Sequence, residues 1–263
     1  GVRISYYCIN KISLTMLHIR DRNKYKLLSI IQARVSSQRL PGKVLLKLGD
    51  SNVIGQVIKR AKMFSDQVVI CTSKNKTDDQ IEEFCLKNNI ECFRGSLNNV
   101  FSRFMNILDK KQYKNYDWFA RLTADNPLVS VQLSSHLKDN IRSGLDYLAY
   151  DNNQIVIGSG IEIINKKSFL NIKETDLDDI EKEHVTLKLY ETKGLYKCKF
   201  IKSPVNNFSS KIRLTLDYKE DYELLEILFK YKKDITNEEA VEFLSKRKDL
   251  LEINKACLPK KVR

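Results

Sequence analysis

The chain has few of the residues that mark specialised architectures. Its 263 residues include nine glycines, four prolines, three histidines and one tryptophan, with no internal repeat and no low-complexity linker. No apolar run approaches the roughly 18–20 residues that a membrane-spanning helix requires. The six cysteines form no CxxC pair and no cluster flanked by histidine, which argues against a zinc site and is typical of reduced thiols. We therefore expect a cytoplasmic protein without a membrane partner.

Acidic residues are also in short supply, since 33 acids face 46 lysines and arginines and leave a net charge of +13. A charge of this sign suits a polyanionic partner, and nucleic acid is one candidate. However, lysine is spread along the whole chain together with many asparagines and isoleucines, a bias that an AT-rich genome also produces. We therefore expect no nucleic-acid partner, and keep a basic nucleic-acid-binding protein as an alternative.

The pattern along the chain predicts one domain. Residues 1–26 differ from the rest, because the first twenty include no acid, and we treat them as an N-terminal extension outside the fold. Residues 27–263 form the expected single domain. Apolar runs that predict strands alternate there with segments of helical periodicity. In the first half the strands are expected at 27–31, 67–71, 90–93 and 118–122, and the helices at 53–63, 77–88 and 98–110.

The second half of the domain is less regular. Strands are expected at 147–150, 154–157, 161–164, 197–202 and 211–216, and helices at 131–143, 181–191, 219–231 and 237–251. Alternating strands and helices predict an α/β fold with right-handed crossovers and a mostly parallel sheet. In such sheets ligands bind beyond the carboxyl ends of the strands.

The loop after the first expected strand has the composition of a polyphosphate site. It carries three cations, two hydroxyls and a Pro-Gly turn: Arg34, Ser36, Ser37, Arg39, Gly42 and Lys43. Arginine can bind phosphate oxygens through two donors at once, while lysine acts as a mobile point charge. Glycine permits a tight turn or a close approach of the backbone. The loop does not match GxxxxGK[ST], and a solvated basic loop is the alternative.

Two aspartates follow other expected strands. Asp125 comes after the strand at 118–122 and before Pro127, and Asp217 comes after the strand at 211–216. Mg²⁺ prefers one or two carboxylates together with phosphate oxygens and water, so both are candidate metal ligands. A turn-initiating aspartate is the alternative for Asp125. Asp221 falls in the first turn of the next helix, where an acid favours the positive end of the dipole.

The chain resembles a known family through an ordered series of motifs. The first is Ala33-Arg-Val-Ser-Ser-Gln-Arg-Leu-Pro-Gly-Lys43. The others are Cys71-Thr-Ser, Asp78-Asp79-Gln-Ile81, Arg94-Gly95, Arg103-Phe104, Arg121-Leu-Thr-Ala-Asp125-Asn-Pro127, Glu183-His184-Val-Thr186 and Arg213-Leu-Thr-Leu-Asp217. This series is similar to that of the sugar cytidylyltransferases, above all the spore-coat polysaccharide biosynthesis branch, which is related to the enzymes that activate ketodeoxyoctonate and acylneuraminate. The resemblance spans roughly residues 27–230.

The resemblance implies a glycosyltransferase-A-like fold, a three-layer α/β/α sandwich with a mostly parallel, mixed sheet that binds CTP and Mg²⁺. By carry-over, the triphosphate would be held by Arg34, Ser36, Arg39 and Lys43, and the metal by Asp125 and Asp217. Relatives usually have glycine where this chain has Ala124, which could tighten the turn before Asp125.

Three further residues are substrate-binding candidates, each with a structural alternative. His184 could contact the carboxylate or phosphate of an acceptor, or be a satisfied half-buried histidine. Glu162 could line the acceptor pocket or have a structural role. Arg94 could face substrate at a strand end or form a surface salt bridge.

We therefore expect a Mg²⁺-dependent cytidylyltransferase that transfers CMP from CTP to a sugar acid or sugar phosphate and releases pyrophosphate. It would act in surface polysaccharide or glycoconjugate biosynthesis. Arg34, Arg39, Lys43 and Asp125 are the expected catalytic residues, and no residue is identified as the proton acceptor. A nucleotide-sugar glycosyltransferase of the same fold is an alternative, although no DxD-type motif typical of that class directly follows an expected strand. The sequence leaves the oligomeric state open, and a homodimer is a candidate because relatives are frequently dimers.

Overall fold

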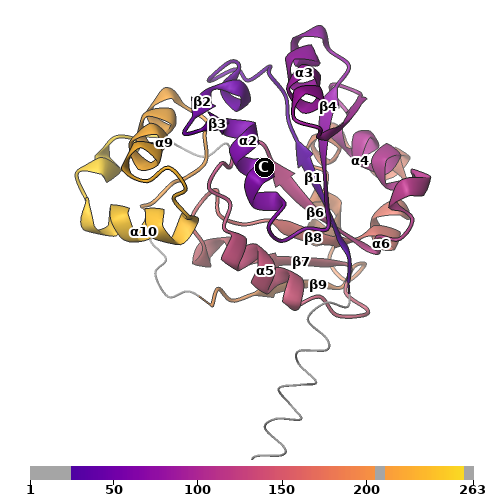
Figure 1. The fold of residues 1–263 in the computed structure, drawn as a ribbon. Helices are drawn as coiled ribbons and strands as arrows, with labels where there is room; N and C mark the ends of the chain where they lie inside the picture. Colours follow the sequence, from indigo (N-terminus) through magenta and orange to yellow (C-terminus); the bar gives the residue numbers. More distant parts are fainter. Residues whose placement is uncertain (1–24, 205–210, 258–263) are drawn as a thin grey trace, which may run out of the picture.

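The computed structural model describes residues 25–204 and 211–257, so the extension expected at 1–26 lies outside the described residues except for its last two. A seven-stranded sheet has the order β5-β4-β1-β6-β8-β7-β9 (Figure 1). Its strands are β1 (Leu27–Gln32), β4 (Gln67–Ser73), β5 (Glu91–Gly95), β6 (Trp118–Thr123), β7 (Tyr147–Tyr150), β8 (Glu162–Asn165) and β9 (Cys198–Ile201). Only β8 runs antiparallel to its neighbours, which confirms the mostly parallel, mixed sheet.

Helices cover both faces of the sheet, because alternate residues of each strand are apolar on opposite sides. On one face α2 (Val53–Ala61), α3 (Asp79–Lys87) and α5 (Val131–Asp139) pack in one apolar cluster with Leu27 and Ile31 of β1. On the other, α4 (Val100–Leu108), α6 (Lys166–Leu170) and α8 (Leu187–Glu191) pack with Leu28 and Ile30. The α/β/α sandwich is therefore confirmed.

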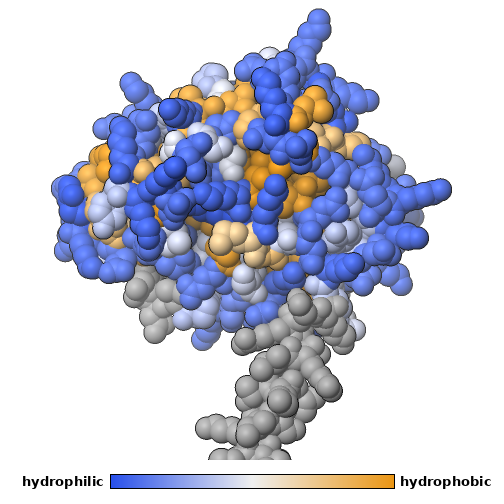
Figure 2. All heavy atoms as spheres, viewed as in Figure 1, coloured by the Kyte–Doolittle hydropathy of each residue, from blue (hydrophilic) through white to orange (hydrophobic). Residues whose placement is uncertain are grey.

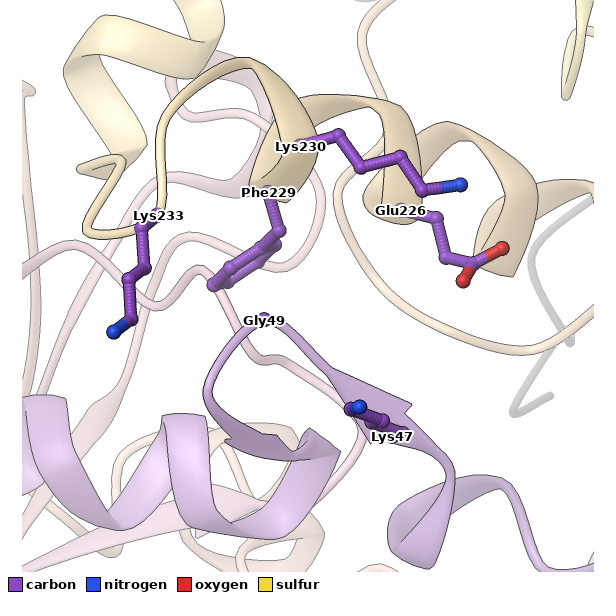
Figure 3. A pocket seen from close by; sticks show the side chains of 6 residues that line it. All are labelled: Lys47, Gly49, Glu226, Phe229, Lys230 and Lys233. Carbon is purple, nitrogen blue, oxygen red and sulfur yellow. The ribbon is translucent and has the colours of Figure 1, made fainter.

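A third apolar cluster lies beside the sandwich, on the left in Figure 1. It joins α9 (Lys219–Tyr231) and α10 (Asn237–Lys246) to a small hairpin of β2 (Lys47–Leu48) and β3 (Ser51–Asn52). Gly49 in the hairpin turn has φ 62°, and a Cβ there would lie 2.8 Å from the ring of Phe229. Beside this contact is a hollow of about 390 Å³ (Figure 3), lined by Lys47, Gly49, Glu226, Phe229, Lys230 and Lys233.

Two of the expected strands are wrong. Residues 154–157 and 211–216 form no strand and share a single bridge, between Ile157 and Arg213. Gly158, with φ 92°, turns the first segment away, and a Cβ there would lie 2.7 Å from the backbone nitrogen of Thr215. The second segment instead bonds across to the end of β6, since Leu216 N donates to Asp125 O at 2.8 Å.

The helix expected at 181–191 is interrupted. The structure has α7 (Asp179–Glu183) and α8, separated at His184–Thr186, where the Thr186 hydroxyl donates to Glu162 of the sheet. Other helices end two to five residues earlier than expected, since α2, α4, α5 and α10 stop at Ala61, Leu108, Asp139 and Lys246. Short 3₁₀ helices complete the fold: η1 (Lys43–Leu45), η2 (Lys76–Asp78), η3 (Lys111–Tyr113), η4 (Asn152–Gln154), η5 (Glu174–Asp176) and η6 (Leu250–Glu252).

The polarity of the surface and of the helices is that expected from the amino-acid composition. In the part of the chain that the structure describes, no helix has the length and apolar character needed to cross a bilayer. Figure 2 shows hydrophilic residues distributed over most of the visible face rather than collected in one region. Cys71, Cys85, Cys92, Cys198 and Cys257 are free thiols, as the sequence predicted.

Candidate functional site

The loop after β1 is folded tightly against the carboxyl end of the sheet. Val35 N donates to Asp78 Oδ1 at 2.7 Å, and Asp78 is completely buried. Gly42 N returns to Val35 O at 3.0 Å, and Gly42 has φ 73°, a conformation that favours glycine. The predicted turn at Gly42 is therefore confirmed. It directs Lys43, the first residue of η1, into the protein, where only 9% of its side chain is exposed.

Lys43 lies at the centre of the site. Its Nζ donates to Asp125 Oδ2 at 2.7 Å, to Asp217 Oδ1 at 2.9 Å and to Leu216 O at 2.7 Å. Asp125 lies two residues after the end of β6, whereas Asp217 lies two residues before the start of α9. Both aspartates therefore meet the loop after β1, as the sequence predicted, although the segment that brings Asp217 there is not a strand.

Two arginines add to the charge around Asp217. Arg39 Nη2 lies 2.7 Å from Asp217 Oδ1, and its guanidinium carbon is 4.8 Å from the centre of the Tyr218 ring. Arg213 Nη2 lies 2.6 Å from Asp217 Oδ2. Burial alone would raise the pKa of Asp217, but the charge and hydrogen bond of Lys43, with the two arginines, hold it below its usual value. Asp217 is thus an ionised carboxylate at neutral pH.

A second carboxylate, that of Asp221, is fully buried and holds Asp217 in position. Asp221 is 0% exposed, and its Oδ2 accepts hydrogen bonds from the backbone nitrogens of Asp217 at 2.9 Å and Tyr218 at 3.0 Å. Its Oδ1 accepts from Arg213 Nε at 3.0 Å and from Asn254 Nδ2 at 2.9 Å. Asp221 lies in the first turn of α9, which confirms the helix-start interpretation. The position of Asp217 therefore depends on this buried network.

The oxygens around Lys43 suit a hard divalent cation. Two carboxylates and one backbone carbonyl converge on a single cationic nitrogen at 2.7–2.9 Å. Mg²⁺ is commonly held by one or two carboxylates, with phosphate oxygens and water filling the other positions. Among residues 25–204 and 211–257, no group of three or more His, Cys, Asp or Glu side chains could hold a metal. The two carboxylates are a donor set that fits an ion whose other positions are filled by phosphate oxygens and water.

The remaining loop candidates lie at the rim of the site. Arg34 is half exposed, and its Nη2 is 3.4 Å from Glu183 Oε1, next to His184. His184 follows α7 as its C-cap and is partly buried. Ser36 is exposed and Ser37 partly so. The loop after β1 therefore lies beside the end of α7, which brings Arg34 and the His184 segment together.

Glu162 occupies the centre of a second polar cluster. Its Oε2 is 2.6 Å from Arg121 Nη1, while its Oε1 accepts from the Tyr147 hydroxyl at 2.6 Å and the Thr186 hydroxyl at 2.8 Å. Arg121 Nε in turn donates to Gln32 Oε1 at 3.0 Å, at the end of β1. Glu162 thus ties the segment after α7 to the sheet, which supports its structural role.

Replacing Glu162 with glutamine should lower the free energy of unfolding by about 2–4 kcal/mol, because Arg121 loses its counter-charge in a largely buried ion pair. Burial raises the pKa of Glu162, but Arg121 and the hydroxyl donors outweigh this and hold it below its usual value. A depressed folded-state pKa adds stability above the unfolded value of about 4.3, and this is lost as pH falls through the folded pKa. Urea titrations from pH 7 to pH 3 should show the two proteins converging in acid. The exposed Glu83→Gln is the control, and a constant difference across this range would contradict the assignment.

Arg94 lies apart from the Lys43 cluster. Its guanidinium is 2.6 Å from Asp79 Oδ1 and 2.7 Å from Glu82 Oε2, and it donates to the carbonyl oxygens of Ser73 and Asn75. These contacts join the end of β4 to α3. The structure therefore places Arg94 in the salt bridges of the alternative interpretation, and its contact with substrate stays a prediction.

Ala124 leaves the position of Asp125 intact. Its nitrogen donates to Gln32 O at 3.0 Å, which continues the pairing of β1 with β6, and its side chain is buried. Ala124 is not among the described residues with positive φ, so no glycine is required there.

The sequence interpretation assigned no role in the site itself to several buried polar residues. Arg213 and Asp221 lie four residues on either side of Asp217, a spacing that could have drawn attention to them. Arg103 of α4 is 3% exposed, and its Nε and Nη1 have no hydrogen-bond partner among the described residues. In the sequence, only the place of Arg103 in the motif series drew attention to this residue.

Comparisons with known proteins show similarity to cytidylyltransferases. A protein-family model described as Cytidylyltransferase matches residues 28–254. The spore coat polysaccharide biosynthesis protein SpsF of Bacillus subtilis is 32% identical over 234 residues, which cover 85% of this chain and 95% of SpsF. The solved structure of a cytidylyltransferase from Leptospira borgpetersenii has a TM-score of 0.78 at 29% identity and covers 86% of this chain and 97% of its own.

A more distant structure shares the fold. The CMP:2-keto-3-deoxy-manno-octonic acid synthetase, solved in complex with CTP, has a TM-score of 0.54 at 14% identity and covers 79% of this chain and 99% of its own. This likeness shows the nucleotidyltransferase fold, in agreement with the sheet and layers described above.

Proposed function

Because the chain belongs to the cytidylyltransferase family, and is thus a nucleotidyltransferase, we propose that it transfers CMP from CTP to a sugar acid or sugar phosphate and releases pyrophosphate. The observation that carries this proposal is the meeting of Arg39 and Lys43 with Asp125 and Asp217 at one edge of the sheet. This pairing of cations with carboxylates suits a metal-bound triphosphate. The name of SpsF supports a role in polysaccharide biosynthesis.

The residues of the loop after β1 have separate roles in the reaction. The acceptor oxygen attacks the α-phosphorus, the bond from this phosphorus to the bridging oxygen breaks, and its electron pair leaves with pyrophosphate. Arg34, Arg39 and Lys43 bind the triphosphate and stabilise the charge that develops on the leaving group. Ser36, Ser37 and the backbone at Gly42 supply hydrogen-bond donors. Most of the rate enhancement comes from positioning and electrostatics.

Asp125 and Asp217 would hold Mg²⁺. When bound, Mg²⁺ would neutralise charge on the phosphate oxygens. The oxygen donors that surround Lys43 fit such an ion, as described above. Asp221 and Arg213 keep Asp217 in place and stay outside the reaction.

The acceptor would enter between the loop after β1 and the end of α7. Arg34 reaches Glu183 there, and His184 follows directly. A histidine and an arginine at this border suit an anionic acceptor, either a carboxylate or a phosphate. The reaction belongs in the cytoplasm, where CTP is available. A homodimer stays a prediction, which light scattering would check.

A pyrophosphate-release screen tests the function. Four nucleoside triphosphates should be combined with a panel of sugar acids and sugar phosphates at physiological Mg²⁺. We expect release that requires both CTP and one class of acceptor. If a nucleotide sugar is consumed instead, the glycosyltransferase alternative gains support. If nothing turns over and DNA or RNA binds with a steep salt dependence, the nucleic-acid alternative replaces this one.

A further inference from the structure

The hydrogen bonds of Lys43 leave its ammonium group without an unused donor for a nucleotide. An ammonium has three donors, and all three are used, by Asp125, Asp217 and the carbonyl of Leu216. The side chain is 9% exposed, so solvent competes little for it. Lys43 therefore cannot bind a phosphate oxygen in this conformation without giving up at least one of these partners.

The two carboxylates face the same conflict. Asp125 and Asp217 hold one cationic nitrogen between them at 2.7 and 2.9 Å, and a divalent cation held between the two carboxylates would lie against this nitrogen. Two cations cannot share this position, because they would repel each other at contact distance. The roles proposed for Lys43, on the triphosphate, and for the aspartates, on the metal, are thus compatible only after Lys43 moves.

We propose that Lys43 fills the position of the divalent cation in the nucleotide-free protein and transfers to the triphosphate when metal and nucleotide bind. This exchange rests on the proposed function, which assigns Lys43 to the triphosphate and the two aspartates to the metal. The exchange keeps the carboxylates neutralised at every stage, which avoids two adjacent unpaired charges in a partly buried site. A lysine suits it, because its ammonium is a point charge on a flexible stem.

The backbone around Lys43 permits the side chain to move alone. The Gly42 turn is fixed by its bond to Val35 O, and η1 follows directly. Asp217 keeps a counter-charge when Lys43 leaves, since Arg213 Nη2 remains 2.6 Å from its other oxygen, Oδ2. Metal binding and nucleotide binding are therefore coupled. Without nucleotide, the metal competes with Lys43 for the aspartates and binds weakly. With nucleotide, Lys43 moves to the triphosphate, and the metal binds more tightly.

Mn²⁺ binding to the full chain, followed by electron paramagnetic resonance, tests this exchange without turnover. In the absence of nucleotide, Lys43→Met should bind Mn²⁺ about tenfold more tightly than the wild type, within the range of ordinary coupling. With CTP present the order should reverse, because the variant lacks a triphosphate contact. The exposed Lys47→Met is the matched control and should behave as the wild type. The double variant Lys43→Met/Asp125→Asn should lose the gain, which locates the ion.

Equal Mn²⁺ affinity of Lys43→Met and the wild type without nucleotide would overturn the exchange, even if CMP transfer is observed. Tighter Mn²⁺ binding by the variant, in a protein that transfers no CMP, would keep the exchange and sink the proposed function. If Lys43→Met loses its cooperative thermal transition, Lys43→Gln allows the same comparison, because its amide can still donate to Leu216 O.

Discussion

Asp125→Asn should lower the rate of pyrophosphate release by about 10³-fold, equivalent to roughly 4 kcal/mol of transition-state stabilisation. The carboxylate is 2.7 Å from Lys43 Nζ and belongs to the oxygen set proposed for the metal. Asparagine preserves the shape of the side chain but removes its charge, so metal and triphosphate lose a shared partner. The side chain of Asp125 is 26% exposed, and the fold should therefore survive. The measurement is pyrophosphate release at saturating CTP and acceptor, alongside a thermal melt.

The control for this prediction is Asp139→Asn. Asp139 ends α5 on the exposed surface and has no contact with the Lys43 cluster. It should turn over as the wild type does. Full pyrophosphate release by Asp125→Asn at physiological Mg²⁺ would rule out its assignment as a metal ligand.

Asp221→Ala should lower the free energy of unfolding by about 3–5 kcal/mol, the cost of breaking a buried ion pair. The carboxylate is completely buried and accepts hydrogen bonds from the backbone of Asp217 and Tyr218. Its removal leaves those donors unsatisfied and Arg213 with one carboxylate instead of two. Because Asp217 would also lose its support, CMP transfer should fall together with stability. Urea denaturation at pH 7 measures the change.

Glu220→Ala is the matched control, since Glu220 is the preceding acid in the first turn of α9 and is exposed. Its loss should cost less than about 1 kcal/mol, the size of a helix-dipole contribution. If Asp221→Ala is no more destabilising than Glu220→Ala, the buried network does not hold this part of the site.

The sequence was sufficient for the parts of the site that follow from the parallel sheet. Lys43 and Asp125 come after strands β1 and β6, and parallel strands end at the same edge, so their meeting could be predicted. The location of Asp217 was correct for a different reason from the one expected. Its segment alternates in hydropathy as a strand does, yet it contacts the sheet through single backbone bonds.

Side-chain partners were beyond the sequence. Nothing in the local pattern says that Lys43 donates to both aspartates, because residues separated by 82 and 174 positions meet only in the folded chain. The break between α7 and α8 was missed for a similar reason. Thr186 continues a helical pattern, and its bond to Glu162 depends on a strand 24 residues earlier.

The product formed from CTP labelled in its α-phosphate tests the central claim most directly. With an acceptor found in the screen, the label should appear in a CMP–sugar conjugate, with one equivalent of unlabelled pyrophosphate, in the wild type and not in Asp125→Asn. Attack at the α-phosphorus allows no other distribution. If the label is recovered in CDP while the acceptor gains a single unlabelled phosphate, the protein transfers the terminal phosphoryl group, and the account given for Arg39, Lys43 and the two aspartates is wrong.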